Sequence, residues 1–376
     1  MTSPTVAPAN ATAGSRHHTV LPHYLAAVYA LAVVYASLQP FGPWIAPPRG
    51  TAFFLVAGGP LRFARFDVLA NVLSYLPLGF LVALVPRVLQ PWGRFSLGLF
   101  VGTLLSFAME SLQMLLPPRD ASVVDLLANM SGAALGAALG VMFATSAPAK
   151  DAVSAARHRW FIGGKIGDLG LALIVVWLVV QVNPGIPLFA TMFDPAIELP
   201  ALPGVNVAGM QADSAAAFIE AAHSAFQLLG VGLFLALLLR QRRFIGGAML
   251  LLVLAAVLLK AIAAALLLHP VVLERWLRPG VAMGVAVGTL LLMIAIWLPR
   301  PAQVAIATIA LFSSLLATLL APDLIFTRAP LALFNWSYGH LLNFNGLTHT
   351  VLLLWPIAAS AFLFALAGRP RWGEPG

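Results

Sequence analysis

Three short stretches of the sequence carry carboxylate and amide side chains at spacings that could serve binding or proton transfer. They are the pairs Asp67 and Asn71, Asp125 and Asn129, and Glu110 and Gln113. Residues three or four positions apart lie side by side on the surface of a helix. Each pair therefore presents one acidic and one amide group in the same direction, which is a suitable arrangement for a polar headgroup or a transferable proton.

The helices that carry these pairs must lie in lipid. Hydrophobic residues make up 61% of the 376 positions, charged residues 9%, and the mean hydropathy is +0.94. Apolar runs of about 20 residues satisfy their own backbone hydrogen bonds as membrane-spanning helices. The sequence predicts an all-α, polytopic helical membrane protein with about ten transmembrane helices. Cysteine is absent, which excludes thiolate metal sites, cysteine nucleophiles and disulfides.

The positions of the basic residues predict the orientation and the division into domains. Lys and Arg are more numerous in the segments that are inside when both termini are cytoplasmic, and the loop 185–214 has neither. This topology explains the net charge of +8 without nucleic-acid binding. We expect a disordered N-terminal tail (1–21), a four-helix membrane domain (22–145), a cytoplasmic linker (146–165) and a six-helix membrane domain (166–368). The predicted spans are 22–41, 67–86, 95–116, 123–144, 166–184, 215–239, 244–268, 280–298, 302–321 and 348–367.

In this topology the three polar pairs meet at the outer face, with basic residues beside them. Ionisable groups in or beside a span are costly in lipid and usually face a bundle interior. The predicted ligand-binding residues are Asp67, Asn71, Glu110, Gln113, Arg119, Asp125, Asn129, Arg62 and Arg65. An alternative is that Asp67 and Asp125 only cap helix N-termini. Capping does not explain Glu110, which lies near a helix C-terminus and needs a cation, and Arg119 is its expected partner.

At these residues the sequence resembles the VanZ-like family of bacterial membrane proteins. The family pattern is Asp-x-x-x-Asn, then Phe-x-Pro-Leu-Gly, Glu-x-x-Gln, an Arg, and Asp-x-x-x-Asn-x-x-Gly. The chain matches it in order and spacing over about residues 20–145, with Tyr75 in place of Phe. The matching positions are Asp67, Asn71, Pro77, Leu78, Gly79, Glu110, Gln113, Arg119, Asp125, Asn129 and Gly132. The resemblance implies a protein of the cell envelope in the bacterial inner (plasma) membrane, from a family named after a protein of low-level glycopeptide resistance.

The C-terminal part of the sequence carries fewer polar signals. Glu220 and His223 form a Glu-x-x-His pair, which is one half of a di-metal bundle site, but no second pair occurs. We therefore expect no metal and no cofactor. Lys260 inside a predicted span is the expected partner of Glu220.

Several functions remain open at this stage. The leading prediction is an outer-face pocket that binds an anionic lipid or a lipid-linked glycan headgroup. Alternatives are a membrane enzyme acting on a lipid-linked phosphate or sugar, with Glu110 or Asp125 as general base and Arg119 stabilising phosphate charge, a transporter, and a structural module. The sequence carries no signal for an oligomeric state.

Overall fold

The protein is built from long helices. The computed structural model describes residues 19–56, 65–117, 119–183, 189, 212–267, 279–320 and 338–369. Within these residues there is no β-strand, only an isolated bridge between Phe161 and Leu239. The predicted all-α class is therefore confirmed.

The helices follow the apolar runs of the sequence closely. They are α1 (Leu21–Leu38), α2 (Arg65–Leu84), α3 (Pro91–Gln113), α4 (Val123–Thr145), α5 (Ala147–Trp160), α6 (Gly164–Val180), α7 (Ala212–Leu238), the short 3-10 helix η2 (Arg242–Phe244), α8 (Ile245–Leu267), α9 (Pro279–Ala295), α10 (Arg300–Leu320) and α12 (Tyr338–Ala367). Each predicted span is occupied by one helix. Seven helices of the described part are long and apolar enough to cross a membrane. The chain is thus a multi-pass membrane protein, while the total of ten spans and the orientation stay predictions.

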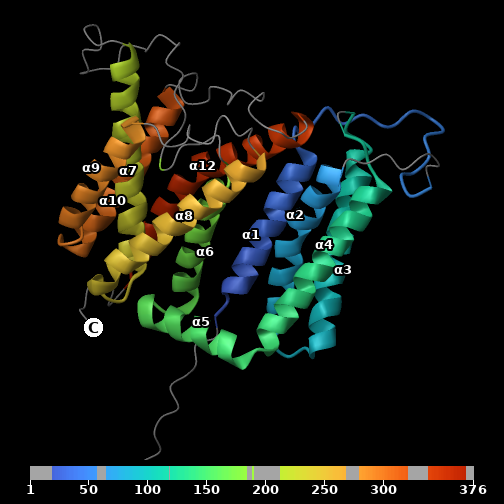
Figure 1. Ribbon diagram of the computed structural model, residues 1–376, viewed down its shortest axis with the longest axis horizontal. Coiled ribbons are helices and arrows are strands. Elements are labelled where there is room, and N and C mark those ends of the chain that lie inside the picture. Colours follow the sequence, from blue (N-terminus) through green and yellow to red (C-terminus); the bar gives the residue numbers. More distant parts are fainter. Residues whose placement is uncertain are drawn as a thin grey trace, which may run out of the picture.

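Two groups of helices lie side by side (Figure 1). Helices α1 to α4 form one group, and α6 to α10 with α12 form the other. Helix α5 lies across one end of the molecule and occupies most of the predicted linker 146–165. No residue of α5 is buried, and its last turn holds Arg157, His158 and Arg159. We call the end that carries α5 the basic end, and the opposite end the acidic end because Asp67, Glu110 and Asp125 lie there.

Glycines bring α2 and α4 into backbone contact. A methyl group added to Gly132 would overlap the carbonyl oxygen of Val72, and one added to Gly136 would overlap that of Leu76. Small residues four positions apart allow this close approach between membrane helices. The contact holds the polar residues of α2 against those of α4.

Helix α1 contacts both groups. The Tyr29 hydroxyl donates to the Ser74 carbonyl of α2 (2.9 Å), and the Tyr35 hydroxyl lies 2.8 Å from the Thr350 hydroxyl of α12. The residues before α1 also have defined partners, because Thr19 and Val20 hydrogen-bond to Asp168. Residues 19–21 therefore do not belong to the disordered tail predicted for 1–21, and residues 1–18 lie outside the described part of the chain.

Candidate functional site

The three polar motifs converge at the acidic end, where α2 and α4 begin and α3 ends. The Asn71 amide donates to the Asp125 carboxylate across the α2–α4 contact, with 2.8 Å between Nδ2 and Oδ1. One turn further along α4, the Asn129 amide donates to the Ser106 hydroxyl of α3 at 2.9 Å. The two Asp-x-x-x-Asn motifs and the end of α3 therefore form one cluster, as their spacing predicted.

The first turn of α4 shows why Asp125 is available to Asn71. Ser122 is the N-cap, and its hydroxyl accepts from the Val124 N–H at 3.1 Å. In a capping box the acidic residue three positions later would accept the N–H of the cap residue. Here Glu110 accepts that N–H instead, at 2.9 Å from Oε2. Ser122 is therefore the N-cap residue of α4, and Glu110 accepts the N–H that Asp125 would accept in a capping box, while Asp125 lies in the first turn of the helix.

Glu110 is held inside the bundle without an ion pair. It is 4% exposed, and the structure places no Arg119 nitrogen within 4.0 Å of its carboxylate. The expected Glu110–Arg119 pair is thus absent, because each side chain binds backbone instead. Burial lowers the pKa of the Arg119 guanidinium, and the Glu110 charge opposes that shift.

Arg119 and Gln113 bind the C-terminal end of α1. Arg119 Nη2 donates to the carbonyls of Ala36 and Gln39, both at 3.0 Å, and Gln113 Nε2 donates to that of Ser37 at 2.9 Å. The last carbonyls of a helix lack intrahelical partners and favour cations. Nε and Nη1 of Arg119 have no hydrogen-bond partner among the described residues.

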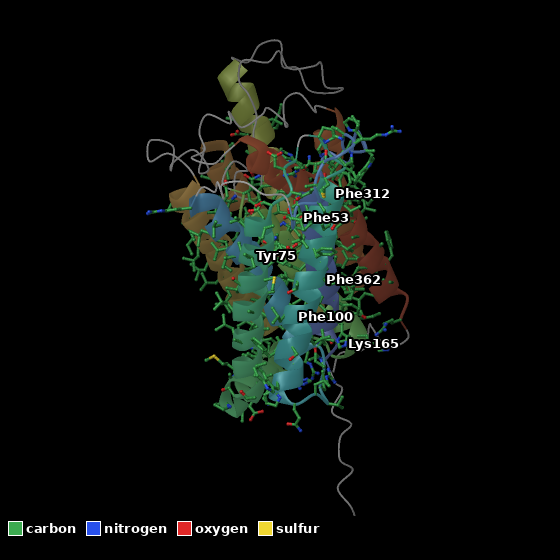
Figure 2. All side chains as sticks on the ribbon, turned by 90° about the vertical axis from the view of Figure 1, so that its right-hand side faces the viewer. Phe53, Tyr75, Phe100, Lys165, Phe312 and Phe362 are labelled. Atoms are coloured by element: carbon green, nitrogen blue, oxygen red, sulfur yellow. The ribbon has the colours of Figure 1, made fainter. Side chains whose placement is uncertain are left out.

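Two buried polar groups of this cluster also lack hydrogen-bond partners among the described residues. The side-chain Oδ1 of Asn129 and the Tyr75 hydroxyl have no hydrogen-bond partner within the described part of the chain, although Asn129 is 5% and Tyr75 3% exposed. In Figure 2, Tyr75 lies in the half of the bundle nearer Phe53, and Lys165 marks the opposite end. Buried polar groups are usually paired, so these two mark a place where a polar ligand or water would fit.

Two of the remaining predicted residues, Asp67 and Arg65, lie at the start of α2. Asp67 lies in the first turn of α2, and the exposed Arg65 begins that helix. Arg62 lies outside the described residues. The segment 39–56 runs over the end of α3, where the Ile45 N–H donates to the Leu115 carbonyl and Phe54 packs near Phe107 with ring centroids 6.1 Å apart.

The polar residues predicted in the C-terminal group are buried as well. Lys260 is fully buried and donates to the Asn183 carbonyl at 2.9 Å, and His223 lies 3.3 Å from the Ser314 hydroxyl. The described residues contain no group of three His, Asp or Glu side chains that could hold a metal ion.

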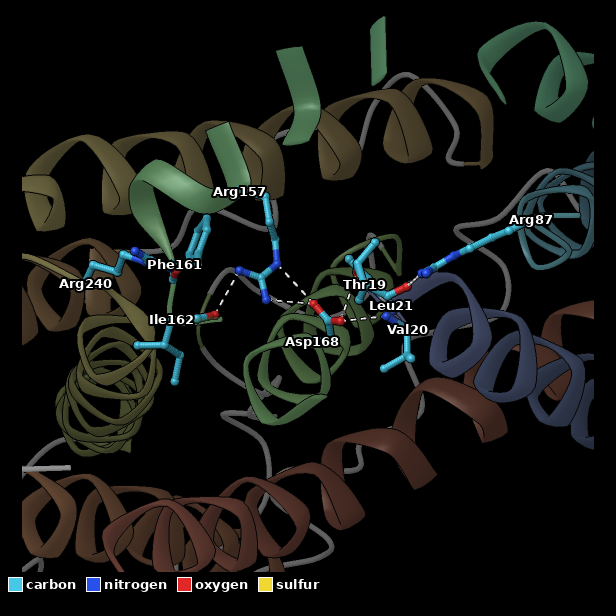
Figure 3. Close-up of polar contacts among 9 residues, drawn as sticks. All are labelled: Thr19, Val20, Leu21, Arg87, Arg157, Phe161, Ile162, Asp168 and Arg240. Carbon is cyan, nitrogen blue, oxygen red and sulfur yellow. Dashed lines mark hydrogen bonds and ion pairs between the residues drawn. The ribbon is translucent and has the colours of Figure 1, made fainter. Parts of the chain in front are cut away.

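A network at the basic end was not predicted. Asp168 of α6 is 1% exposed and pairs with Arg157 of α5, with Nη2 2.7 Å from Oδ1 (Figure 3). Its other oxygen accepts from the Thr19 hydroxyl at 2.9 Å and the Val20 N–H at 2.7 Å, and Arg87 donates to the Thr19 carbonyl. An aspartate inside the predicted span 166–184 was the signal for this network, because an ionisable group in lipid requires a partner.

Fold and site together define a multi-pass helical membrane protein whose N-terminal helices hold a buried polar cluster at one end. Residues 10–144 match the family model described as VanZ/LLP1. The N-terminal segment is therefore VanZ-like, as the motif resemblance predicted. No curated protein and no solved structure matches the chain.

Proposed function

We propose that the protein is a cell-envelope protein of the bacterial inner (plasma) membrane, and that its acidic end binds the headgroup of an anionic lipid or lipid-linked glycan. The observation that carries the proposal is the state of Arg119. Its guanidinium is anchored on α1 by Nη2, and among the described residues it has no carboxylate within 4.0 Å and no hydrogen-bond partner for Nε and Nη1. A preoriented guanidinium with free N–H groups is suited to a phosphate oxygen.

The neighbouring groups suit the glycan part of such a headgroup. Sugar hydroxyls both donate and accept hydrogen bonds, so they complement the carboxylate of Glu110 and the unsatisfied oxygens of Asn129 and Tyr75. Because the segment 39–56 covers the end of α3, the proposal requires this segment to move when the ligand enters.

Binding to the purified full-length protein tests the proposal. In mild detergent, a sugar-linked polyprenyl phosphate should bind, and an uncharged polyprenol of the same length should bind at least about tenfold more weakly, as expected for loss of one charge-assisted contact. Asp125→Asn should weaken binding of the phosphate-linked sugar, whereas Asp120→Asn, in the exposed loop of the same end, should not. Equal binding of both lipids, or full affinity in Asp125→Asn, would contradict the proposal.

A further inference from the structure

A second set of arginines surrounds a pocket at the basic end, far from the VanZ-like residues. The pocket lies where α7 ends, α8 and α10 begin and α9 ends. Its polar lining consists of Arg240, Arg242, Arg300 and Gln303. Its apolar lining includes Leu237, Leu239, Ile245 and Ile296. A pocket with basic side chains at its mouth and aliphatic walls matches the two halves of a phospholipid.

Two of the arginine side chains, Arg240 and Arg242, retain donors that could reach an anion. Arg240 uses only Nε, which donates to the Phe161 carbonyl at 2.8 Å, and Arg242 uses only Nη2, at 3.5 Å from the Leu298 carbonyl. Neither has a carboxylate within 4.0 Å among the residues that the structure describes. Like charges placed together repel one another, and a bound anion offsets that repulsion.

The surroundings provide almost no negative charge. Among the described residues of the basic end, the carboxylates are Asp151 on α5 and Asp168, and Asp168 is paired with Arg157. Arg159 and Arg243 lie over the Phe244 ring beside the pocket, at 5.7 Å and 5.0 Å from its centroid. The described residues around the pocket are therefore mainly basic.

The walls of the pocket are fixed by internal hydrogen bonds. Gln303 is 4% exposed, and its amide donates to the carbonyls of Ile296 and Leu298 at 2.8 and 2.9 Å. These bonds close the turn between α9 and α10. The turn positions Arg300 at the N-terminus of α10, where the helix dipole also favours an anion.

Helix α9, which is followed by the pocket-lining residue Ile296, has an exposed apolar face. Leu290, Ile294 and Trp297 follow one another at spacings of four and three residues, and are 55%, 60% and 73% exposed. An exposed tryptophan at the end of a span is typical of the headgroup level of a bilayer. An acyl chain lying along this face would bring its phosphate to the arginines.

We propose that the pocket formed by Arg240, Arg242 and Arg300 binds the phosphate of an anionic phospholipid whose acyl chains lie along α9. The shared chemistry is a phosphate group, so free phosphate is the alternative source. The apolar walls and the adjoining face of α9 favour the lipid. This site is independent of the proposed ligand at the acidic end, since the two sets of residues lie at opposite ends of the molecule (Figure 1).

Native mass spectrometry of the full-length protein in mild detergent can test this proposal with three probes: short-chain phosphatidylglycerol, short-chain phosphatidylcholine and inorganic phosphate. Phosphatidylglycerol should bind at least about tenfold more tightly than phosphatidylcholine, and inorganic phosphate should not displace it. Arg242→Gln should weaken phosphatidylglycerol binding roughly fivefold or more, and Arg242→Lys should restore most of it because the charge returns. Lys150→Gln, which removes an exposed charge from α5 at the same end, is the matched control and should bind as wild type.

Three results would overturn the lipid assignment. The first is equal binding of the two lipids. The second is unchanged phosphatidylglycerol binding in the double variant Arg240→Lys/Arg242→Gln. This variant changes both arginines but keeps a positive charge at position 240, beside the Phe161 carbonyl. The third is displacement of the lipid by inorganic phosphate, which would assign the pocket to a soluble anion.

Discussion

Glu110 illustrates how a carboxylate can be kept inside a membrane bundle without a salt bridge. It accepts the Ser122 N–H at 2.9 Å and is 4% exposed. That bond satisfies one backbone donor at the start of α4, but it leaves the negative charge poorly solvated. A charge at such a place would not stabilise the fold, which supports the proposed role of Glu110 in ligand binding.

The first prediction concerns the stability of variants at this position. Glu110→Gln keeps an acceptor for Ser122 and removes the buried charge, so unfolding free energy in detergent should stay within about 0.5 kcal/mol of wild type or rise. Arg119→Gln should be destabilising by roughly 1–3 kcal/mol, because the carbonyls of Ala36 and Gln39 lose a donor. Thermal unfolding of the two single variants and the double variant measures both values.

The same cycle tests whether Glu110 and Arg119 act as a pair. Since no ion pair joins them within 4.0 Å, the two changes should be additive to within about 0.5 kcal/mol. A coupling of several kcal/mol would mean that the two charges meet in the membrane, and would contradict the geometry described for Glu110.

At the scale of helices, the contact between α2 and α4 determines where the polar residues lie. Gly132 and Gly136 face the carbonyl oxygens of Val72 and Leu76. This backbone contact brings Asn71 within 2.8 Å of Asp125. The site therefore depends on residues that cannot themselves bind a ligand.

The second prediction uses the opposite effects of Gly→Ala changes in open and in crowded helices. Gly136→Ala should be destabilising by about 1–3 kcal/mol, because the new methyl group overlaps the Leu76 carbonyl. Gly246→Ala is the matched control, since nothing lies within 4 Å of its added methyl group, and it should be neutral or stabilising by up to about 1 kcal/mol. The midpoints of thermal unfolding in detergent measure both effects. Equal changes of the midpoint in the two variants would argue against the close packing of α2 and α4.

Much of the helix arrangement could be predicted from the sequence. Apolar runs form helices because lipid offers the backbone no other partner, and the four-residue spacing of Gly132, Gly136 and Gly140 is typical of close contact between membrane helices. The hydrogen-bond partner of Glu110 could not be predicted. Glu110 binds the Ser122 N–H because the loop between α3 and α4 brings Ser122 next to it. The path of this loop cannot be predicted from a local sequence pattern.

At the scale of the whole molecule, α1 connects the VanZ-like helices to the rest of the chain. Its N-terminal end binds Asp168 of α6 through Thr19 and Val20, and Tyr35 contacts α12. Thr19 and Asp168 are 149 positions apart in the sequence. Sequence reasoning could mark Asp168 as a buried charge but could not supply its partners. The division into a four-helix and a six-helix domain stays a prediction.

The third prediction is that Asp168 holds these parts together. Asp168→Asn leaves Arg157 without its ion-pair partner, and we expect destabilisation of about 3 kcal/mol, the lower part of the range for breaking a buried pair because Arg157 is partly exposed. Combining it with Arg157→Gln should be less destabilising than the sum of the two single changes. Asp151→Asn on the exposed surface of α5 should have little effect on thermal unfolding. Strict additivity of the Asp168 and Arg157 changes would refute the role of the pair.

The central claim is that the acidic end holds a phosphate-bearing lipid or lipid-linked glycan. The most direct measurement is mass spectrometry of the lipids that co-purify with the full-length protein after mild-detergent extraction from its own membrane, for wild type, Asp125→Asn and Arg242→Gln. Asn at position 125 can still accept the Asn71 hydrogen bond, so the fold should persist while the charge is lost. We predict that wild type and Arg242→Gln retain the same phosphate-linked species at the acidic end and that Asp125→Asn loses it. An Asp125→Asn protein that is folded and carries the same lipids as wild type would contradict the claim.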